Sequence, residues 1–157
     1  MEEQLDQWDI GPNDLAICGG ARGADILFAE LCLKRKAEVW LLLALPIGEF
    51  LEESVRLSGT DWEDRFFKLE TDGAKLFYQH DRLGAPPKGA SPFPRTNLWI
   101  INSGIVEART PAQLHALLVW DEKPPEKNKP GGTSDFAERV EKFGGRKAII
   151  NPTKLHV

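Results

Sequence analysis

The amino-acid sequence predicts an α/β fold in which a doubly wound, mainly parallel sheet carries helices on both faces. Two observations lead to this prediction. Short apolar runs alternate with segments of helical spacing along most of the 157 residues, and two glycine-bearing turns follow predicted strands. Alternating strands and helices imply right-handed crossovers and therefore parallel strands. Ligands of such sheets bind beyond the carboxyl ends of the strands, where the chain order switches direction.

Four apolar runs predict the strands. Residues 14–18 form a short run that ends in glycines, and residues 114–121 form another. Residues 38–46 are continuously apolar up to a proline, as expected of a strand that is covered on both faces. Residues 146–152 predict the final strand.

Between these runs, helical spacing predicts helices over residues 24–36, 48–57, 61–69, 95–108 and 133–143. The last of these is expected to end at Gly144 and Gly145. Residues 70–94 are the least regular part of the chain. Within them, residues 84–94 contain four prolines, which predict neither helix nor central strand because proline lacks a backbone N–H.

The composition is that of an ordinary globular domain, with 41% hydrophobic and 28% charged residues. The net charge is -4 and no dense cluster of lysine and arginine occurs, so we expect no nucleic-acid partner. The acidic N-terminus has no apolar core for a signal peptide, and the longest apolar run is too short to span a bilayer. We therefore expect a cytoplasmic protein without a membrane partner.

The cysteines and histidines do not form a metal-binding pattern. Cys18 and Cys32 lie outside the spacings of metal-ligand pairs, and the three histidines are scattered. We expect no metal site and no other cofactor. Cys18 ends an apolar run and Cys32 falls in a helical pattern, so both are expected to be reduced residues of the core.

The stretch "GGARGAD" after the first predicted strand is a candidate phosphate site. Gly19, Gly20 and Gly23 permit positive φ angles and a close approach to the backbone, and the following helix start offers N–H groups. A few such N–H groups and one cation, here Arg22, can hold a phosphate. Asp25 lies in the first helical turn, where a carboxylate suits the helix dipole. The alternative is a tight turn that only begins a helix.

The stretch "PGGTSDFAE" repeats this pattern later in the chain. Gly131 and Gly132 shape a loop, and Thr133 and Ser134 bring hydroxyl groups to a helix start. The alternative is an N-cap by Thr133 or Ser134. Asp121, at the end of the preceding strand, lies on the rim where a polar group meets a ligand. Two such turns in one doubly wound chain favour a nucleotide or nucleotide-like ligand in the cleft between them.

With both turns in place, the sequence resembles the SLOG superfamily of Rossmann-like domains, which includes the Lonely-Guy enzymes. The resemblance rests on the GG-x-x-G and P-G-G motifs quoted above. A closer resemblance, over residues 14–155, is to an uncharacterised bacterial branch that is often attached to tetratricopeptide repeats or cyclase-type signalling modules. It implies one SLOG-like domain over residues 1–157. In that branch an additional strand usually precedes this region, so the chain is expected to be a short form or a fragment.

The Lonely-Guy enzymes imply phosphoribohydrolysis, the loss of the base from a nucleoside monophosphate. Glu138 falls at the position of their motif's glutamate, and Arg65 follows Asp61 at the spacing of their catalytic arginine. The alternatives are a solvated surface glutamate and an ion pair between Arg65 and Asp61. Ser134 and Asp135 replace the glycine and threonine of the enzymes' motif, and an acidic residue there is expected to weaken monophosphate binding.

Three functions follow from these observations. The preferred one is a binding module that senses a nucleotide or nucleotide-derived second messenger and passes the signal to fused or partner domains. The alternatives are a hydrolase of N-glycosidic bonds in nucleotides and a scaffold with a vestigial pocket. The sequence leaves the identity of the ligand and the formation of a homodimer open.

Overall fold

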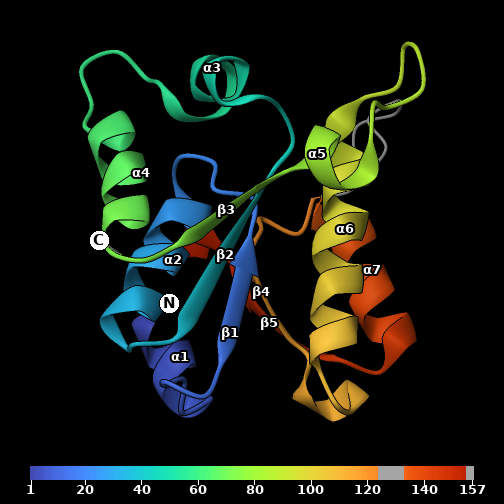
Figure 1. Cartoon of the computed structure of the whole chain (residues 1–157). Coiled ribbons are helices and arrows are strands. Elements are labelled where there is room, and N and C mark those ends of the chain that lie inside the picture. The colour runs from blue at the N-terminus through green and yellow to red at the C-terminus, as the bar shows by residue number, and fades with distance from the viewer. Residues whose placement is uncertain (124–132, 155–157) are drawn as a thin grey trace. The chain divides into compact units, whose positions relative to one another are not determined.

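The computed structural model describes residues 1–123 and 133–154, and all strands paired in this part of the chain run parallel (Figure 1). The predicted α/β fold with parallel strands is therefore confirmed. The chain divides into two units, residues 1–92 and 93–157, and each has a parallel sheet of its own. The prediction of a single domain stays a prediction.

The first unit alternates helices with three strands. Its elements are α1 (Glu2–Gln7), β1 (Leu15–Cys18), α2 (Ala24–Lys34), β2 (Glu38–Leu43), α3 (Ile47–Phe50), the π-helix η1 (Leu51–Val55), α4 (Trp62–Thr71), β3 (Lys75–Tyr78) and α5 (Gln79–Leu83). The second unit begins in the first turn of α6. Its elements are α6 (Pro92–Glu107), the 3₁₀ helix η2 (Pro111–Gln113), β4 (His115–Val119), α7 (Thr133–Phe143), β5 (Arg146–Ile150) and the 3₁₀ helix η3 (Pro152–Lys154).

Strand β2 lies in the centre of the first sheet, between β1 and β3. Its consecutive residues Leu41, Leu42 and Leu43 are all buried. Because neighbouring side chains of a strand point to opposite faces, both faces of β2 are covered, as its continuous apolar run predicts. The register places Cys18 of β1 beside Leu41, so the turn after β1 lies at the carboxyl edge of the sheet.

Helices α2 and α4 pack against each other, and α2 also contacts β1 and β2 (Figure 1). The core of this unit includes buried side chains from these two helices and from β2, namely Ile26, Ala29, Cys32, Phe66, Leu69, Val39, Leu41 and Leu43. Both cysteines are free and buried, as predicted. Burial raises the pKa of the Cys32 thiol to about 12, so this thiol is uncharged at neutral pH.

Three segments differ from the sequence-based expectation. The irregular residues 70–94 contain β3 and α5, and the predicted helix over 48–57 consists of α3 followed by the π-helix η1. The prediction that residues 84–94 contain no helix is wrong for their last three residues, because α6 begins at Pro92 and includes Pro94. Proline is tolerated there because the first N–H groups of a helix have no partner within it.

The side chain of Gln79, the first residue of α5, closes the segment that runs from α5 to the first residue of α6. Gln79 is 1% exposed, and its Nε2 donates a hydrogen bond of 2.8 Å to the carbonyl oxygen of Pro92. Between these two residues, nearly all side chains are exposed. The bond therefore holds the two ends of a surface loop together from inside the fold.

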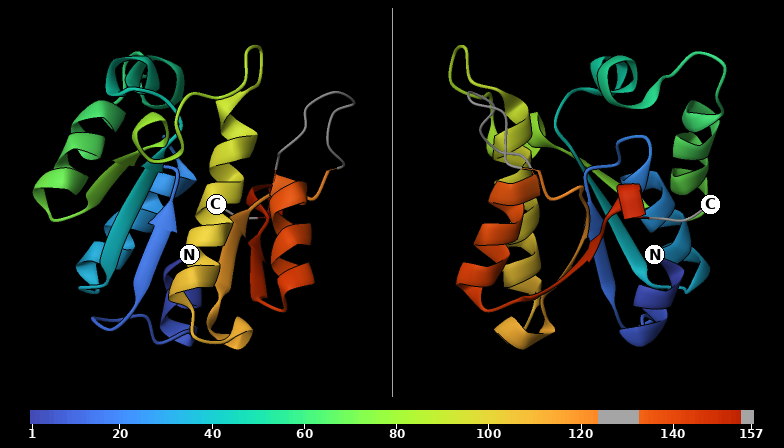
Figure 2. Two further views of the ribbon diagram at one scale, coloured as in Figure 1. Left: turned by 45° about the vertical axis from the view of Figure 1, so that its right-hand side comes forward. Right: turned by 180° about the vertical axis from the view of Figure 1, so that it is seen from behind.

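In the second unit, α7 packs on the parallel pair of β4 and β5, beside which it lies in Figure 2. Its core contains the buried residues Ile101, Ala116, Leu118, Ala137 and Val140. These come from α6, β4 and α7, with Ile149 of β5 packed against them. This unit thus repeats the strand–helix–strand pattern of the first.

Helix α7 ends at the predicted glycines. Gly144 has φ +83°, and its N–H donates to the carbonyl oxygen of Glu141 at 2.9 Å. The N–H of Gly145 donates to the carbonyl oxygen of Val140 at 3.0 Å. These are the two hydrogen bonds of a Schellman motif, which supplies partners for the last carbonyl groups of a helix.

We expect Gly145→Ala to lower the free energy of unfolding by about 1–3 kcal/mol, because the added Cβ overpacks the end of α7. It would lie 3.0 Å from Val140 Cγ1 and 3.1 Å from the Leu114 carbonyl oxygen. Gly48→Ala is the control, since its Cβ would meet no atom within 4 Å. Denaturant titration of both variants checks the prediction, and equal stabilities would contradict it.

Candidate functional site

The turn between β1 and α2 is the best-formed candidate site of the first unit. Gly20 has φ +75° and Gly23 has φ +88°, both in a region that favours glycine. No side chain caps the start of α2 by a hydrogen bond. The turn therefore places a helix N-terminus, with its partial positive charge, at the carboxyl edge of a parallel sheet.

Gly20 and Gly23 differ in what surrounds their Cα atoms. A Cβ at Gly20 would lie 3.2 Å from Leu43 Cδ2 and 3.3 Å from Phe66 Cε2, so a side chain there would require these core residues to shift by a few tenths of an ångström. A Cβ at Gly23 would meet no atom of residues 1–123 or 133–154 within 4 Å. Of these two glycines, only Gly23 leaves free space beside its backbone, where a ligand could approach. Gly19 is half-buried beside them.

The carboxylate of Asp25 points back from α2 towards the backbone of the β1–α2 turn. Its Oδ2 accepts a hydrogen bond from the backbone N–H of Ala21 at 3.2 Å. Burial raises the pKa of the Asp25 carboxyl group, and hydrogen bonds from the backbone of Ala21, Gly19 and Gly20 oppose this shift. Asp25 thus stabilises the turn from within.

Arg22 ties the turn to the π-helix that follows β2 and α3. Its backbone N–H donates to the Ser54 carbonyl oxygen at 2.9 Å, and its Nη1 donates to the Arg56 carbonyl oxygen at 3.2 Å. The side chain is exposed and has no carboxylate partner in the described part of the chain. Arg22, the neighbour of Gly23 in the sequence, therefore carries an exposed cation that is held by a carbonyl oxygen.

A second arginine near the β1–α2 turn is neutralised by its neighbours. Arg56 donates two hydrogen bonds of 2.7 Å to the Glu63 carboxylate and also contacts Glu52. The hydrogen bond to Arg56 lowers the pKa of Glu63. Because two carboxylates bind Arg56, this arginine adds no net positive charge near the turn.

Arg65, the candidate catalytic cation, is held between α2 and α4. Its Nε and Nη2 donate to the two carboxylate oxygens of Glu30 at 2.8 and 2.5 Å, and its guanidinium lies 4.4 Å from the Trp62 ring centre. The sequence-based alternative named Asp61 as the partner, but Glu30 supplies the hydrogen bonds and Asp61 adds a smaller charge interaction. Arg65 thus joins two helices.

Arg65 and Glu30 line a surface groove of about 500 Å³ between α2 and α4. The rest of its lining is Leu33, Lys34, Lys68, Leu69 and Asp72. None of the turn residues 19–25 belongs to this lining. Arg65 therefore does not share this groove with the glycines of the turn.

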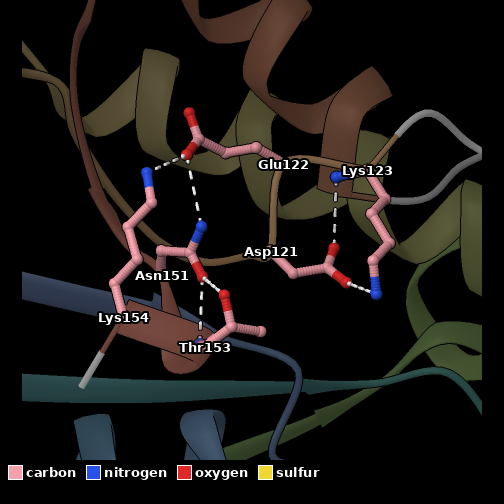
Figure 3. A network of polar contacts seen from close by, with 6 residues as sticks. All are labelled: Asp121, Glu122, Lys123, Asn151, Thr153 and Lys154. Atoms are coloured by element: carbon pink, nitrogen blue, oxygen red, sulfur yellow. Dashed lines mark hydrogen bonds and ion pairs between the residues drawn. The ribbon is translucent and has the colours of Figure 1, made fainter. Parts of the chain in front are cut away.

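In the second unit, Asp121 follows β4 and belongs to a polar network at the carboxyl ends of β4 and β5 (Figure 3). It accepts a hydrogen bond of 3.2 Å from the Lys123 backbone N–H and pairs with Lys123 Nζ at 2.9 Å. The hydrogen bond from the Lys123 side chain lowers the pKa of Asp121. Local contacts thus engage both carboxylate oxygens of Asp121.

The neighbouring part of the network joins β4 to β5. Glu122 has φ +60°, and its Oε2 accepts hydrogen bonds from Asn151 Nδ2 at 3.3 Å and Lys154 Nζ at 3.4 Å. Asn151 Oδ1 in turn accepts from the Thr153 hydroxyl at 2.7 Å (Figure 3). The network fixes how the chain leaves both strands.

The remaining candidates follow Asp121 in the chain. Gly131 and Gly132 lie outside the described residues. Thr133 and Ser134 are half-buried in the first turn of α7, which begins at Thr133. The alternative of an N-cap by either residue stays a prediction. The exposed Glu138 pairs with Lys142 at 2.7 Å, one helical turn away. The predicted joining of the two glycine turns into one cleft stays a prediction.

Sequence reasoning missed the partners that hold these candidates. Glu30 lies 35 residues before Arg65, and no local pattern predicts that pairing. The contact of Ser54 with the turn depends on the π-helix, whose sequence has ordinary helical spacing. The spacing of Glu52 and Arg56, by contrast, is a recognisable i, i+4 pair.

Comparisons with known proteins give no significant match to a protein-family model, a curated protein or a solved structure. Among the helices in the described ranges, none has the length and apolar character needed to cross a membrane. Residues 1–123 and 133–154 also contain no group of three metal-ligating side chains.

We expect Asp25→Asn to stabilise the protein at neutral pH, because asparagine keeps an acceptor for Ala21 and removes a half-buried charge. A carboxyl group whose pKa is raised by folding contributes stability below its unfolded pKa, near 3.9, and this is lost as the pH rises through the folded pKa. The gain in the free energy of unfolding from Asp25→Asn should therefore grow as the pH rises from the unfolded pKa through the folded pKa. Urea titrations from pH 3 to 8 test this, and an advantage independent of pH would contradict it.

We expect Arg65→Lys to lower the free energy of unfolding by about 1 kcal/mol, because lysine cannot form the paired hydrogen bonds to Glu30. Lys68→Arg on the same helix is the matched control, since Lys68 makes an exposed i, i+4 pair with Asp72. Thermal unfolding of both variants measures the difference. An unchanged melting temperature for Arg65→Lys would show that the Arg65–Glu30 pair does not stabilise the fold.

Proposed function

We propose that the protein binds a nucleotide or nucleotide-derived small molecule at the turn between β1 and α2. In this proposal, a phosphate group of the ligand lies beside Gly23, accepts hydrogen bonds from the first N–H groups of α2 and contacts the Arg22 guanidinium. The protein then acts as a cytoplasmic sensing module, and its ligand-bound form is recognised by fused or partner signalling domains.

The observation that carries the proposal is the free space beside Gly23. Gly23 has φ +88°, a Cβ there would meet no atom within 4 Å, and α2 begins directly behind it without a side-chain cap. Core packing limits the room at Gly20, whereas the backbone at Gly23 is open towards the described residues and lies at the start of a helix. Arg22 supports the proposal because its guanidinium is exposed and, within the described part of the chain, pairs with a carbonyl oxygen at 3.2 Å and with no carboxylate.

Phosphoribohydrolysis has no specific observation in its favour. Its two expected side chains are each engaged, Arg65 by Glu30 and Glu138 by Lys142. Arg65 also lines a groove that excludes the turn residues. A direct assay for base released from nucleoside monophosphates would detect this activity if it occurs.

We expect at least one ligand in a panel of nucleoside monophosphates, cyclic nucleotides and ADP-ribose to raise the melting temperature, because a ligand that binds only the folded state stabilises it. Arg22→Ala should then weaken the affinity about tenfold or more, since it removes a charge-assisted hydrogen bond to the phosphate. Isothermal titration calorimetry measures that loss.

Lys34→Ala is the matched control, because it removes the same charge from the other end of α2 and should leave the affinity unchanged. Arg22→Lys separates charge from geometry and should recover part of the affinity. A panel in which no ligand shifts the melting temperature would support the vestigial scaffold. Equal losses of affinity in Arg22→Ala and Lys34→Ala would show that the ligand does not bind at the turn.

A further inference from the structure

The proposed phosphate site already contains a negative charge of its own. Asp25 lies in the first turn of α2, and its Oδ2 is 3.2 Å from the backbone nitrogen of Ala21. An ionised carboxylate only accepts hydrogen bonds, so Asp25 uses the same kind of donor that a phosphate needs. A ligand at Gly23 must therefore share the turn with this carboxylate.

No cation forms an ion pair with Asp25 in the described part of the chain. From β1, the buried Cys18 Sγ contacts the Asp25 carbonyl oxygen at 3.6 Å, and burial keeps this thiol uncharged. From the turn, the Arg22 guanidinium reaches away to the Arg56 carbonyl oxygen.

The other charges near this rim come from η1, from the residue after it and from α4. Among these charges, Arg56 donates hydrogen bonds to the carboxylates of both Glu52 and Glu63. Among them the two carboxylates outnumber the one guanidinium. The negative charge of Asp25 is therefore not neutralised locally.

The carboxylate of Asp25 repels a phosphate group more strongly when that group carries more negative charge. A phosphomonoester carries about -1.5 to -2 at neutral pH, because its second pKa is near 6. A phosphodiester has lost that second ionisable group and carries a single negative charge. Since Coulomb repulsion is proportional to the product of the charges, Asp25 repels the monoester up to about twice as strongly.

We propose that Asp25 is a specificity-determining residue that excludes terminal monophosphates, so that the site takes a ligand whose phosphate is a singly charged diester, as in cyclic nucleotides. This inference rests on the proposed function, because it concerns the same turn and requires that a phosphate binds there. It adds the ligand class and the side chain that selects it.

The test compares two ligands with the same base, adenosine 5′-monophosphate and cyclic adenosine monophosphate, by calorimetry or by competition at pH 7.5. We expect Asp25→Asn to raise the affinity for the monophosphate about tenfold more than the affinity for the cyclic diester. Each ligand is compared with itself across variants, so differences in ligand shape cancel.

Asp25→Ser is a second neutral variant that retains an oxygen in the first turn of α2, and it should change the ratio of affinities in the same direction. Asp64→Asn is the control, because it removes an exposed carboxylate from α4 and should leave the ratio unchanged. Melting temperatures of all variants, measured without ligand, verify that each is folded.

The outcomes separate the two proposals. If the wild type and both Asp25 variants bind neither nucleotide nor any ligand of the panel, the proposed function fails. If nucleotides bind but the ratio of affinities is the same in the wild type and in both Asp25 variants, the proposed function stands and the selection by Asp25 is overturned.

Discussion

The close packing of Gly20 against Leu43 and Phe66 is the constraint on which the first unit depends. It brings the backbone of the β1–α2 turn into contact with the central strand and with α4. A side chain at this position would require Leu43 and Phe66 to shift, because protein cores have little free volume. With the turn fixed in this way, the start of α2 and the carboxylate of Asp25 have one place relative to the sheet.

An ion pair and hydrogen bonds around this core join elements that are distant in the sequence. Glu30 and Arg65 connect α2 to α4, and the backbone and side chain of Arg22 connect the turn to the chain around η1. Each of these side chains is polar and partly or fully exposed, yet each acts between elements of the fold. A charged residue near a glycine-rich turn is therefore not by itself a sign of a ligand, and its partners decide how it is interpreted.

The sequence predicted the fold well where its signal was periodic. The continuous apolar run of β2, the glycines that end α7 and the alternation of strands with helices are local patterns, and the structure confirms them. β3 has only four residues beside an irregular region, and α6 begins with prolines that resemble those of a loop. Short elements of this kind depend on tertiary packing, which sequence spacing does not contain.

The candidate site was predicted less completely for the same reason. The turn and its glycines are visible in the sequence, but their different purposes depend on what surrounds each Cα. Nothing in "GGARGAD" distinguishes Gly20, which packs on the core, from Gly23, which opens to free space. Likewise, the partner of Arg65 is 35 residues away. The choice between a catalytic cation and a link between helices therefore depends on a tertiary contact that the sequence does not show.

The hydrogen bond from Gln79 to Pro92 also has a consequence for how this chain tolerates added sequence. Because the ends of the loop between these residues are joined from inside the fold, the loop itself does not have to hold them together. Lengthening a flexible loop costs only about 0.6 kcal/mol for each doubling of its length. The exposed stretch around Lys88 and Gly89 is therefore a natural position for inserting a peptide tag or a reporter domain without disturbing β3 or α6.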